Sequence, residues 1–375
     1  MGGSHQVLYD LAAGIDRTRF EPVALFNQDN VFVQKLRDIG VEVVVFDDVL
    51  RNEREVNRRA GIVRKFVAYG ANVLRRRREL RRLRIDVLHL NNSPLVGSDD
   101  WLPAAWLARV PCIVTVAGGS GSPRRLIHRW LYRRFDVYLA ISRYMTGILR
   151  HNGVDPRRIE LVYPGVDFTN LKRRVTRSRD DVRSELGVKP DQVLAIMVGN
   201  IREWKGQREV IAALRELPEN VREHLLVCFA GATATADRDY EATLREDIEI
   251  GNLGGCVSFL GSRTDVADLY SAADIALHAS ITPEPFGLVV PEAMALNCAV
   301  IAASTGGPTE VIVPGTGLLC DPAEPTEYAR ALELLVEDQS LREMIAAAAP
   351  PRALRFSMER NIEGTQRAYE RVLTQ

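Results

Sequence analysis

The sequence has few cysteines and no long apolar run. Its five cysteines lie scattered in apolar surroundings such as LLVCFAG and show neither a disulfide framework nor zinc-ligand spacing, which favours reduced core thiols in a cytoplasmic protein. No apolar run approaches the roughly 18–20 residues needed to cross a bilayer, and the N-terminus lacks the charged-then-apolar pattern of a signal peptide. We therefore expect a soluble protein with at most a peripheral membrane contact.

Two common nucleotide-binding fingerprints are also missing. The chain has neither Gly-x-Gly-x-x-Gly after a strand nor a Gly-x-x-x-x-Gly-Lys-Ser/Thr loop. Asp237 and Asp239 lie in the polar stretch TATADRDYEATLRED, where aspartates are expected to cap a helix start rather than bind a metal. We therefore expect neither a metal nor a cofactor. Gly306-Gly307 fits either a phosphate cradle or a tight turn.

The composition is that of an ordinary soluble protein, with 46% hydrophobic and 26% charged residues. A length of 375 residues exceeds one core and favours two domains of roughly 150–200 residues each. The net charge is zero, but residues 1–170 carry 27 Lys and Arg against 18 Asp and Glu, whereas residues 171–375 carry 22 against 31. The halves are therefore oppositely charged, which predicts different partners for each.

Short apolar runs alternate with helical stretches in the first half. The runs 22–26, 41–46, 86–93, 112–119 and 136–142 are typical of buried strands, and a helix is expected over residues 31–39. This alternation predicts a parallel sheet covered on both faces. Ligands of such sheets bind at the carboxyl ends of the strands. Those ends carry Asn91, Asn92, Gly118, Gly119, Ser142 and Arg143.

The chain opens with Gly2-Gly3-Ser4-His5, followed directly by the helical pattern QVLYDLAAGI. A doubly wound domain normally opens with an apolar strand, then a glycine turn, then a helix. The turn and the helix are present here but the strand is not, so we expect the first strand to be missing. A flexible terminus is the alternative interpretation of the two glycines.

Residues 51–84 form a strongly basic stretch that ends in RRRRELRRLR. Arginines surround the expected helix, so it lacks the single apolar face of a membrane-surface helix. A solvated helix end is one interpretation, and contact of Arg75–Arg84 with an anionic membrane or acceptor is the other. No aromatic residue interleaves these arginines, which argues against nucleic acid as a partner.

A second strand-loop-helix pattern opens the second half of the chain. The apolar run 193–198 leads into Gly199 and Asn200, then into a loop with Arg202 and Lys205, and then into a further glycine and a helix. Cations in such a loop suit a diphosphate, because arginine offers a fork of donors and lysine a point charge. We therefore expect both side chains to bind phosphate.

Residues 282–297, TPEPFGLVVPEAMALN, combine two carboxylates with a predicted helix start. Glu284 stands at the expected mouth of the helix, and Glu292 stands about two turns in, among apolar neighbours. A buried carboxylate is costly without a partner, which favours a functional role over a solvated helix face. Helix starts attract anions, and carboxylates accept hydrogen bonds from hydroxyls. A nucleotide sugar carries both kinds of group.

This segment resembles the Glu-x7-Glu signature of the retaining glycosyltransferases with two Rossmann-like domains (the GT-B fold), in particular glycosyltransferase family 4, the glycosyl transferases group 1. The segments GGSH, NIREWKG, FLGSRTDV, EPFG and PEAMA occur in the family's order along nearly the whole chain. The resemblance implies that Glu284 contacts the donor sugar and that Glu292 holds the ribose. It also implies that the nucleotide base is held largely through backbone groups near Arg263.

Further site residues complete the prediction. The expected donor contacts also include Gly199, Asn200, Phe286, Gly287 and Leu288, and the expected acceptor or phosphate loop comprises Gly2, Gly3, Ser4, His5 and Ser142. Two positions depart from the family pattern. Asn200 stands where an arginine often follows the glycine, so Arg202 is inferred as its substitute, and the histidine that many members carry at the position of Ala117 or Gly118 is missing.

Together these patterns predict an α/β protein with two Rossmann-like doubly wound domains facing a cleft, the first without its opening strand. Residues 1–166 would form the acceptor domain, 167–355 the nucleotide-sugar domain, and 356–375 a terminal helix that crosses back to the first domain. Such an enzyme would serve glycan or cell-envelope biosynthesis in the cytoplasm, in solution or peripherally at the inner face of the membrane.

The predicted reaction is the transfer of a hexose from a UDP- or GDP-sugar to a hydroxyl of a glycan, lipid-linked or small-molecule acceptor, with retention and without a metal. Lys205 and Arg202 would stabilise the leaving diphosphate, and Glu284 would orient the sugar. An epimerase or phosphorylase of the same fold and a non-catalytic nucleotide-sugar-binding protein are the alternatives.

Overall fold

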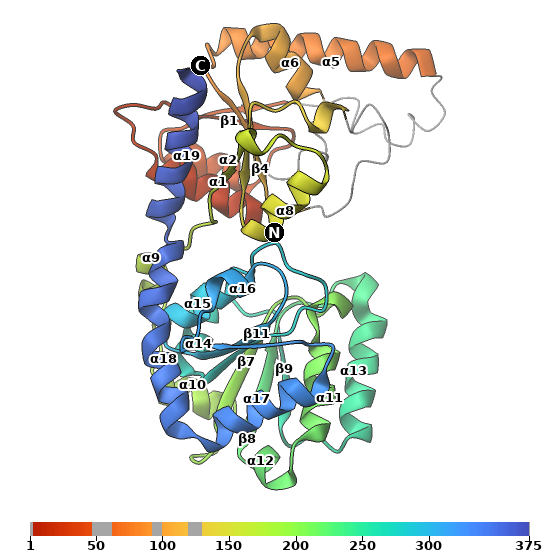
Figure 1. Cartoon of the computed structure of the whole chain (residues 1–375), viewed down its shortest axis with the longest axis vertical. Coiled ribbons are helices and arrows are strands. Elements are labelled where there is room, and N and C mark those ends of the chain that lie inside the picture. Colours follow the sequence, from red (N-terminus) through yellow and green to blue (C-terminus); the bar gives the residue numbers. More distant parts are fainter. Residues whose placement is uncertain (1–2, 47–61, 92–99, 119–129, 375) are drawn as a thin grey trace. The chain divides into compact units, whose positions relative to one another are not determined.

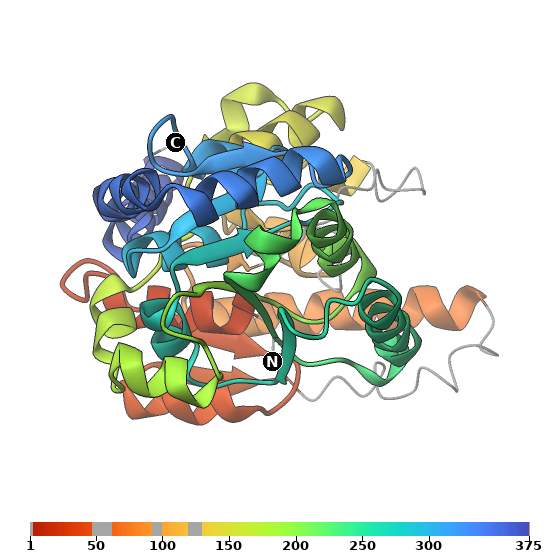
Figure 2. The ribbon, with the colours of Figure 1, turned by 90° about the horizontal axis from the view of Figure 1, so that it is seen from below.

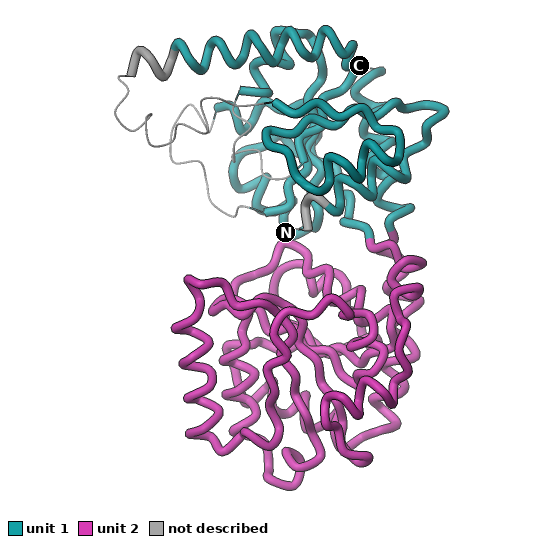
Figure 3. Tube along the Cα trace, turned by 180° about the vertical axis from the view of Figure 1, so that it is seen from behind, with its two compact units in different colours: residues 1–165, 358–375 teal, residues 166–357 magenta. Residues whose placement is uncertain are grey.

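The computed structural model describes residues 3–46, 62–91, 100–118 and 130–374 (Figure 1). The chain divides into two compact units, shown in different colours in Figure 3. Unit 1 comprises residues 1–165 and 358–375, and unit 2 comprises residues 166–357. Three residues named above, Gly2, Asn92 and Gly119, lie outside the described residues.

Unit 1 alternates strands and helices as the apolar pattern predicts. Its elements are α1 (Gly3–Gly14), β1 (Val23–Phe26), α2 (Val31–Asp38), β2 (Glu42–Val45), α5 (Ile62–Arg82), β3 (Leu88–Leu90), α6 (Trp101–Ala108), β4 (Cys112–Val116), β5 (Val137–Ala140), α8 (Arg143–His151), β6 (Ile159–Leu161) and, from the end of the chain, α19 (Met358–Leu373). Each expected strand is found within its predicted range, and β3 is the shortest relative to that range.

The strands of unit 1 form two separate parallel sheets. One sheet pairs β1 with β2, with Val23 opposite Glu42, and the other has the order β3-β4-β5-β6. Helix α19 packs on the larger sheet, because Ala368 and Val372 share a buried cluster with Ile113 and Leu139. Both sheets belong to unit 1. Within the described residues, no strand of one sheet pairs with a strand of the other.

Residues 75–82, near the end of the basic stretch, form the last turns of α5. Most of the arginines within residues 75–84 are exposed: Arg75, Arg78, Arg81, Arg82 and Arg84. The buried residues of this part of the helix are Val73, Arg76 and Leu80. The guanidinium of Arg76 lies 2.7 Å from a carboxylate oxygen of Asp100 and stacks 4.4 Å from the ring centre of Trp101. One arginine of the stretch is thus a packing residue that fixes α5 to the start of α6.

Unit 2 contains α9 (Phe168–Arg173), α10 (Arg179–Glu185), β7 (Val193–Val198), α11 (Gln207–Glu216), α12 (Glu219–Glu223), β8 (Leu225–Ala230), α13 (Arg238–Ile250), β9 (Val257–Gly261), α14 (Val266–Ala272), β10 (Ile275–His278), α15 (Val289–Ala295), β11 (Ala299–Ala303), α16 (Pro308–Val311), β12 (Leu318–Cys320), α17 (Pro325–Glu337) and α18 (Gln339–Ala353). Apolar residues of β7 and β8 face a buried cluster with α11, α13 and α17, and α14, α15 and α18 contact the strands from their other side (Figures 1 and 2). The four central strands β7, β8, β10 and β11 are therefore almost wholly buried, which explains why they are almost continuously apolar.

The sheet of unit 2 has the strand order β12-β11-β10-β7-β8-β9, with every pair parallel. In chain order within the unit this is 6-5-4-1-2-3, the doubly wound arrangement. The winding reverses direction between β7 and β10, which are neighbours. In doubly wound sheets the connections that follow two such strands lead to helices on opposite faces, and ligands bind at the carboxyl ends of the strands there.

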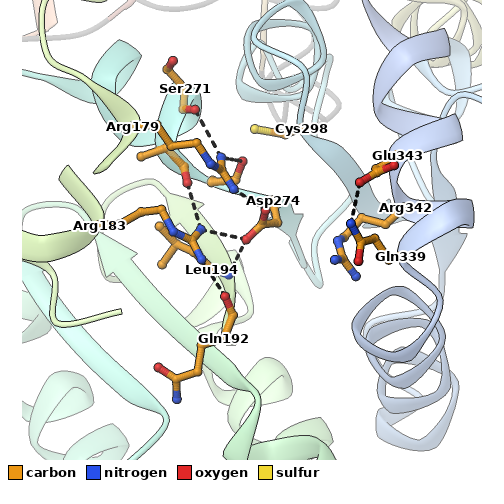
Figure 4. A network of polar contacts seen from close by, with 12 residues as sticks. Arg179, Arg183, Gln192, Leu194, Ser271, Asp274, Cys298, Gln339, Arg342 and Glu343 are labelled. Atoms are coloured by element: carbon orange, nitrogen blue, oxygen red, sulfur yellow. Dashed lines mark hydrogen bonds and ion pairs between the residues drawn. The ribbon is translucent and has the colours of Figure 1, made fainter. Parts of the chain in front are cut away.

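A polar network holds the amino ends of β7 and β10 together (Figure 4). Asp274, directly before β10, accepts hydrogen bonds from the backbone N–H of Leu194 at 2.7 Å and from Arg183 at 2.9 Å, and it also pairs with Arg179. Burial opposes ionisation of Asp274, but the Leu194 hydrogen bond and the two arginines outweigh it and lower the pKa of this carboxyl. The network fixes the register of the two strands whose opposite ends carry the site.

Candidate active site

Two loops meet at the carboxyl ends of β7 and β10. The backbone N–H of Ile281 donates to the carbonyl of Trp204 at 3.0 Å, which joins the loop after β10 to the loop after β7. Gly206 has a φ of +83°, and a Cβ atom at this position would lie only 1.8 Å from the carbonyl oxygen of Ala279. Only glycine therefore allows the two loops to pack this closely.

A buried charged cluster lies where these loops meet. Lys205 Nζ donates to Glu284 Oε1, His278 Nε2 contacts Glu284 Oε2, and Ser280 Oγ lies 3.4 Å from that same oxygen. The side chains of Lys205 and Glu284 are 15% and 13% exposed, and that of His278 is 4% exposed. The structure thus brings the predicted lysine and the predicted first glutamate into direct contact.

The cluster keeps Glu284 ionised. Burial alone would raise the pKa of Glu284, but the hydrogen bond and charge of His278, with the charge of Lys205, lower it to about 2. At neutral pH this carboxylate accepts hydrogen bonds and does not act as a general acid. Since Nε2 of His278 faces a carboxylate, it acts as the donor, and the buried Nδ1 of the ring has no hydrogen-bond partner among the described residues.

Two glycines lock the backbone of Glu284. The N–H of Gly307 donates to the Glu284 carbonyl at 2.8 Å. A Cβ atom at Gly306 would lie 2.4 Å from that carbonyl oxygen, and one at Gly307 would lie 2.2 Å from the Cα of Phe286. The glycine pair thus allows close backbone packing that positions Glu284 from behind, a role that differs from both the phosphate cradle and the tight turn considered for it.

Glu292 lies closer to the helix start than the sequence predicts. Helix α15 begins only at Val289, so Glu292 is in its first turn rather than two turns in. The delay has a physical cause, because Gly287 has a φ of +84° and forms a left-handed turn before the helix. Glu292 is partly buried, and burial raises the pKa of its carboxyl to about 7, although the charge of Arg174 opposes this shift.

The raised pKa of Glu292 predicts a pH-dependent stability. The folded state holds the proton of Glu292 more tightly than the unfolded state does. The stability that results is therefore fully present below about pH 4.5 and is lost as the pH rises towards 7. We expect Glu292→Gln to increase the free energy of unfolding by about 1–3 kcal/mol at pH 8 and to change it little at pH 4.5. Thermal unfolding at both pH values measures this. Glu249→Gln, at an exposed position on α13, is the control, and a shift independent of pH would contradict the assignment.

The two predicted arginines of the donor site have ion-pair partners of their own. Arg202 is 44% exposed, and its Nε lies 3.3 Å from Asp237 Oδ2. Asp237 holds the N-cap position of α13 but makes no capping hydrogen bond, so the capping role predicted for it is wrong. Arg263 pairs with Asp265 at 2.6 Å and with Glu185 at 2.8 Å.

The backbone residues of the basic loop lie next to the lysine. A Cβ atom at Gly199 would lie 3.7 Å from Cε of Lys205, and the φ of Gly199 is +153°. The carbonyl of Asn200 accepts a hydrogen bond from the buried Gln207 at 3.1 Å. Phe286 is 2% exposed, and Leu288 occupies the N-cap position of α15. Of these residues, Gly199 therefore lies against the side chain of Lys205.

The predicted acceptor residues lie in unit 1. Helix α1 begins at Gly3, so Gly3, Ser4 and His5 form its first turn. Ser142 is fully buried and caps α8, where its hydroxyl accepts a hydrogen bond from the N–H of Met145 at 3.0 Å. Within the described ranges, no three His, Cys, Asp or Glu side chains are grouped to hold a metal ion. No helix among those residues is both long and apolar enough to span a bilayer.

Sequence reasoning missed His278. The residue ends the apolar strand β10, and its only sequence signal is a polar side chain at the carboxyl end of a buried strand, six residues before Glu284. A single histidine creates no periodicity, and its partner is defined only by the turn that follows. The position of His278 next to the two-glutamate segment is the sequence feature that could have identified it.

Comparisons with known proteins agree on both units. Residues 2–165 match the family model described as glycosyl transferase 4-like domain, and residues 178–352 match that described as glycosyl transferases group 1. The D-inositol 3-phosphate glycosyltransferase of Salinispora arenicola is 30% identical over 325 residues, which are 80% of this chain and 72% of that protein. That of Rhodococcus opacus is 33% identical over 226 residues, 59% of this chain and 50% of that protein. The chain spans about half the length of the first curated relatives that it matches.

Solved structures show the same architecture. HepE of Anabaena, determined in complex with UDP, superposes with a TM-score of 0.80 at 24% identity and covers 100% of this chain and 97% of its own. A glycosyltransferase from Rickettsia africae gives a TM-score of 0.84 at 18% identity, with 99% of this chain and 95% of that chain covered.

The two parallel α/β units and these likenesses define a GT-B fold with two Rossmann-like domains, so the predicted fold class is confirmed. Within that class, the chain belongs to the glycosyl transferases group 1 family, glycosyltransferase family 4. The resemblance read from the two-glutamate segment and the basic loop is thereby confirmed.

Proposed function

We propose that this protein transfers a hexose from a UDP- or GDP-sugar to an acceptor hydroxyl, with retention of configuration and without a metal ion. The observation that carries the proposal is the Lys205–Glu284–His278 cluster at the carboxyl ends of β7 and β10, where the strand order of unit 2 reverses. In doubly wound sheets the ligand binds at this point. Family membership and the UDP complex of the HepE likeness support a nucleotide sugar as that ligand.

Lys205 is the proposed electrostatic catalyst. Its ammonium group is held in a site that is largely shielded from water, so its attraction for a diphosphate is stronger than in a solvated loop. Negative charge grows on the leaving diphosphate as the glycosidic bond breaks, and a preorganised cation stabilises it. Arg202 is the second proposed cation, and it would exchange its ion pair with Asp237 for a phosphate contact.

Glu284 is the proposed sugar-orienting residue. Lys205 and His278 each occupy one of its two oxygens, yet a carboxylate has about four lone-pair sites and can still accept a sugar hydroxyl. A carboxylate fixed from two sides would hold that hydroxyl in one orientation, which lowers the entropic cost of reaching the reactive geometry.

The remaining proposed donor contacts come from other loops of unit 2 and from the start of α15. Glu292 would accept hydrogen bonds from the ribose hydroxyls, which favour its ionised form and offset the effect of burial. The N–H groups of Gly287 and Leu288, which directly precede α15, would face the diphosphate, because the positive end of a helix dipole favours an anion; the buried Phe286 precedes them in the chain. Backbone groups near Gly199, Asn200 and Arg263 would complete the nucleotide site; the last of these is proposed for the base.

The acceptor side rests on unit 1. Gly2, Gly3, Ser4, His5 and Ser142 stay the proposed acceptor or phosphate residues. The relatives named above act, by their names, on D-inositol 3-phosphate, which makes it the first acceptor to test. The exposed arginines of α5 are proposed to contact an anionic membrane or a lipid-linked acceptor, with the protein otherwise in the cytoplasm.

The function is tested by incubating the protein with a panel of UDP- and GDP-sugars, with and without D-inositol 3-phosphate and with EDTA present throughout. Mass spectrometry would detect the released nucleoside diphosphate and the glycosylated product, and NMR would assign the anomeric configuration. We expect acceptor-dependent release. Sugar isomerisation without an acceptor would indicate an epimerase, and binding without turnover across many acceptors would indicate a non-catalytic protein.

His278 should act as a positioning residue rather than contact the substrate. His278→Gln keeps a donor that can reach Glu284 but removes any positive charge, so we expect turnover to fall by only about 3- to 10-fold. His278→Leu removes the donor, and a loss of about 10- to 100-fold in turnover is expected. Steady-state kinetics measures the difference in turnover between the two variants. Equal losses in the two variants would show that the Nε2 hydrogen bond is not what matters.

A further inference from the structure

Trp204 lies at the surface of unit 2, beside the buried pair of Lys205 and Glu284. It directly precedes Lys205 in the loop after β7 and is the one tryptophan of unit 2. Trp204 is 36% exposed, whereas the side chain of Lys205 is 15% exposed. A single exposed aromatic residue is ordinary on a protein surface. What sets Trp204 apart is therefore the group that its ring contacts.

The indole ring of Trp204 contacts the ammonium group of Lys205. The Nζ atom lies 4.3 Å from the ring centre, within the roughly 6 Å over which an aromatic face attracts a cation. The same Nζ donates a hydrogen bond to Oε1 of Glu284. Because Lys205 is largely shielded from water, the ring attracts it more strongly than it would attract a solvated lysine. The ammonium is thus held by a carboxylate and by an aromatic face.

The local backbone explains how two consecutive side chains come into contact. Neighbouring residues of a regular helix do not face each other. Here residues 203–205 form a single 3-10 turn, which ends at Gly206 with a φ of +83°. The carbonyl of Trp204 also accepts a hydrogen bond from the N–H of Ile281 at 3.0 Å. The turn, the left-handed glycine and the anchor to the loop after β10 therefore fix the backbone that carries the ring.

An aromatic face holds an ammonium group in a different way from a carboxylate. Glu284 is ionised and neutralises the charge of Lys205, whereas the indole ring is uncharged and attracts the cation through its quadrupole. A second carboxylate in place of Trp204 would add negative charge and repel a diphosphate. The ammonium has three N–H donors, and Glu284 accepts from one of them. Trp204 therefore fixes the position of the ammonium without adding negative charge to the site.

We propose that Trp204 is a positioning residue for Lys205: its indole face holds the ammonium group where the diphosphate of the donor meets it. This inference rests on the proposed function, because it assigns Trp204 to the nucleotide-sugar site. Trp204 acts on the ligand through Lys205. Its effect on affinity therefore depends on the presence of the lysine.

The test measures the affinity for UDP and for GDP by isothermal titration. Trp204→Leu keeps an apolar side chain but removes the aromatic face, so we expect affinity to fall by about 3- to 30-fold. Trp204→Phe keeps a smaller aromatic face and should lose less than about threefold. In a chain that already carries Lys205→Met, Trp204→Leu should change affinity by less than about twofold, because the cation is absent.

Trp130→Leu is the matched control. Trp130 is 48% exposed in unit 1, and the guanidinium of Arg134 lies 4.7 Å from its ring centre, so this change also removes an aromatic face beneath a cation. It should leave the affinity for both nucleotides unchanged. Melting temperatures of all variants identify any that is unfolded. Equal losses caused by Trp204→Leu with and without Lys205 would overturn the proposal.

A second measurement needs no nucleotide. In the full chain with ¹³Cε-labelled lysine, the ring current of Trp204 should shift the Lys205 methylene protons upfield. Trp204→Leu should abolish this NMR shift and Trp204→Phe should keep part of it; an unchanged shift in Trp204→Leu would overturn the contact. If the wild type binds neither UDP nor GDP, the proposed function fails and the role of Trp204 fails with it. Normal wild-type binding with additive losses overturns the role of Trp204 alone.

Discussion

Replacing Lys205 with methionine is expected to lower turnover of a nucleotide-sugar donor by about 10²- to 10³-fold. Methionine keeps the length of the side chain and can still lie against Trp204, over whose ring the Lys205 ammonium now sits at 4.3 Å. The variant removes the charge that the growing diphosphate charge would meet. Affinity for the bare nucleoside diphosphate should fall as well, by roughly 10- to 150-fold, because a charge-assisted contact is lost.

Steady-state kinetics and isothermal titration measure these two effects. Lys189→Met is the matched control, since Lys189 is an exposed lysine of the same unit and should leave both unchanged. Arg202→Ala should cause losses of affinity and turnover between those of Lys205→Met and Lys189→Met, because Arg202 is more exposed and already paired with Asp237. Unchanged binding and turnover in Lys205→Met would mean that the lysine serves only to neutralise Glu284.

The part of the fold that could be predicted from the sequence is the part set by local pattern. Buried parallel strands are continuously apolar, so the runs 193–198 and 112–119 identified β7 and β4 without further information. The resemblance to glycosyltransferase family 4 predicted one donor site for Lys205 and Glu284, and the structure brings these two side chains into contact.

The features that could not be predicted from the sequence depend on contacts between distant segments or on a single backbone angle. Gly306 could not be assigned from sequence, because its role is the close approach to the Glu284 backbone, 22 residues earlier. Arg76 looked like one more surface arginine, and only the position of Asp100 and Trp101 makes it a buried residue. The start of α15 was misjudged because the left-handed Gly287 delays the helix, and an apolar run alone does not reveal where its first turn begins.

The cluster also explains how a buried lysine and glutamate can serve a ligand. Before a donor binds, Lys205 and Glu284 compensate each other, and His278 supports the carboxylate from its other oxygen. Breaking such a pair by removing one partner is costly, whereas adding a ligand that offers an anion to the lysine and a hydroxyl to the carboxylate satisfies both. On the proposed function, the cluster is therefore arranged for a ligand that carries both groups.

Changing the two glutamates separately should give different kinetic results. Glu284→Gln removes the charge opposite Lys205 and places an amide N–H₂ group against one of its two donors, Lys205 or His278. We expect turnover to fall by about 10- to 150-fold, since a charge-assisted hydrogen bond to the transferred sugar is lost. Affinity for bare UDP or GDP should not fall, because the sugar is absent from that ligand.

Glu292→Gln should instead weaken binding of the bare diphosphate and of the nucleotide sugar alike, because the ribose is part of both. Assays at pH 8 keep the wild-type carboxylate ionised above its pKa of about 7. We expect an affinity loss of about 10- to 150-fold with a smaller effect on turnover, since uniform binding affects KM more than kcat. Melting temperatures are measured in parallel, because replacing a buried charge also changes stability. If both variants bind UDP and GDP as the wild type does, Glu292 does not hold the ribose; if both also keep full turnover, the two-glutamate segment is structural.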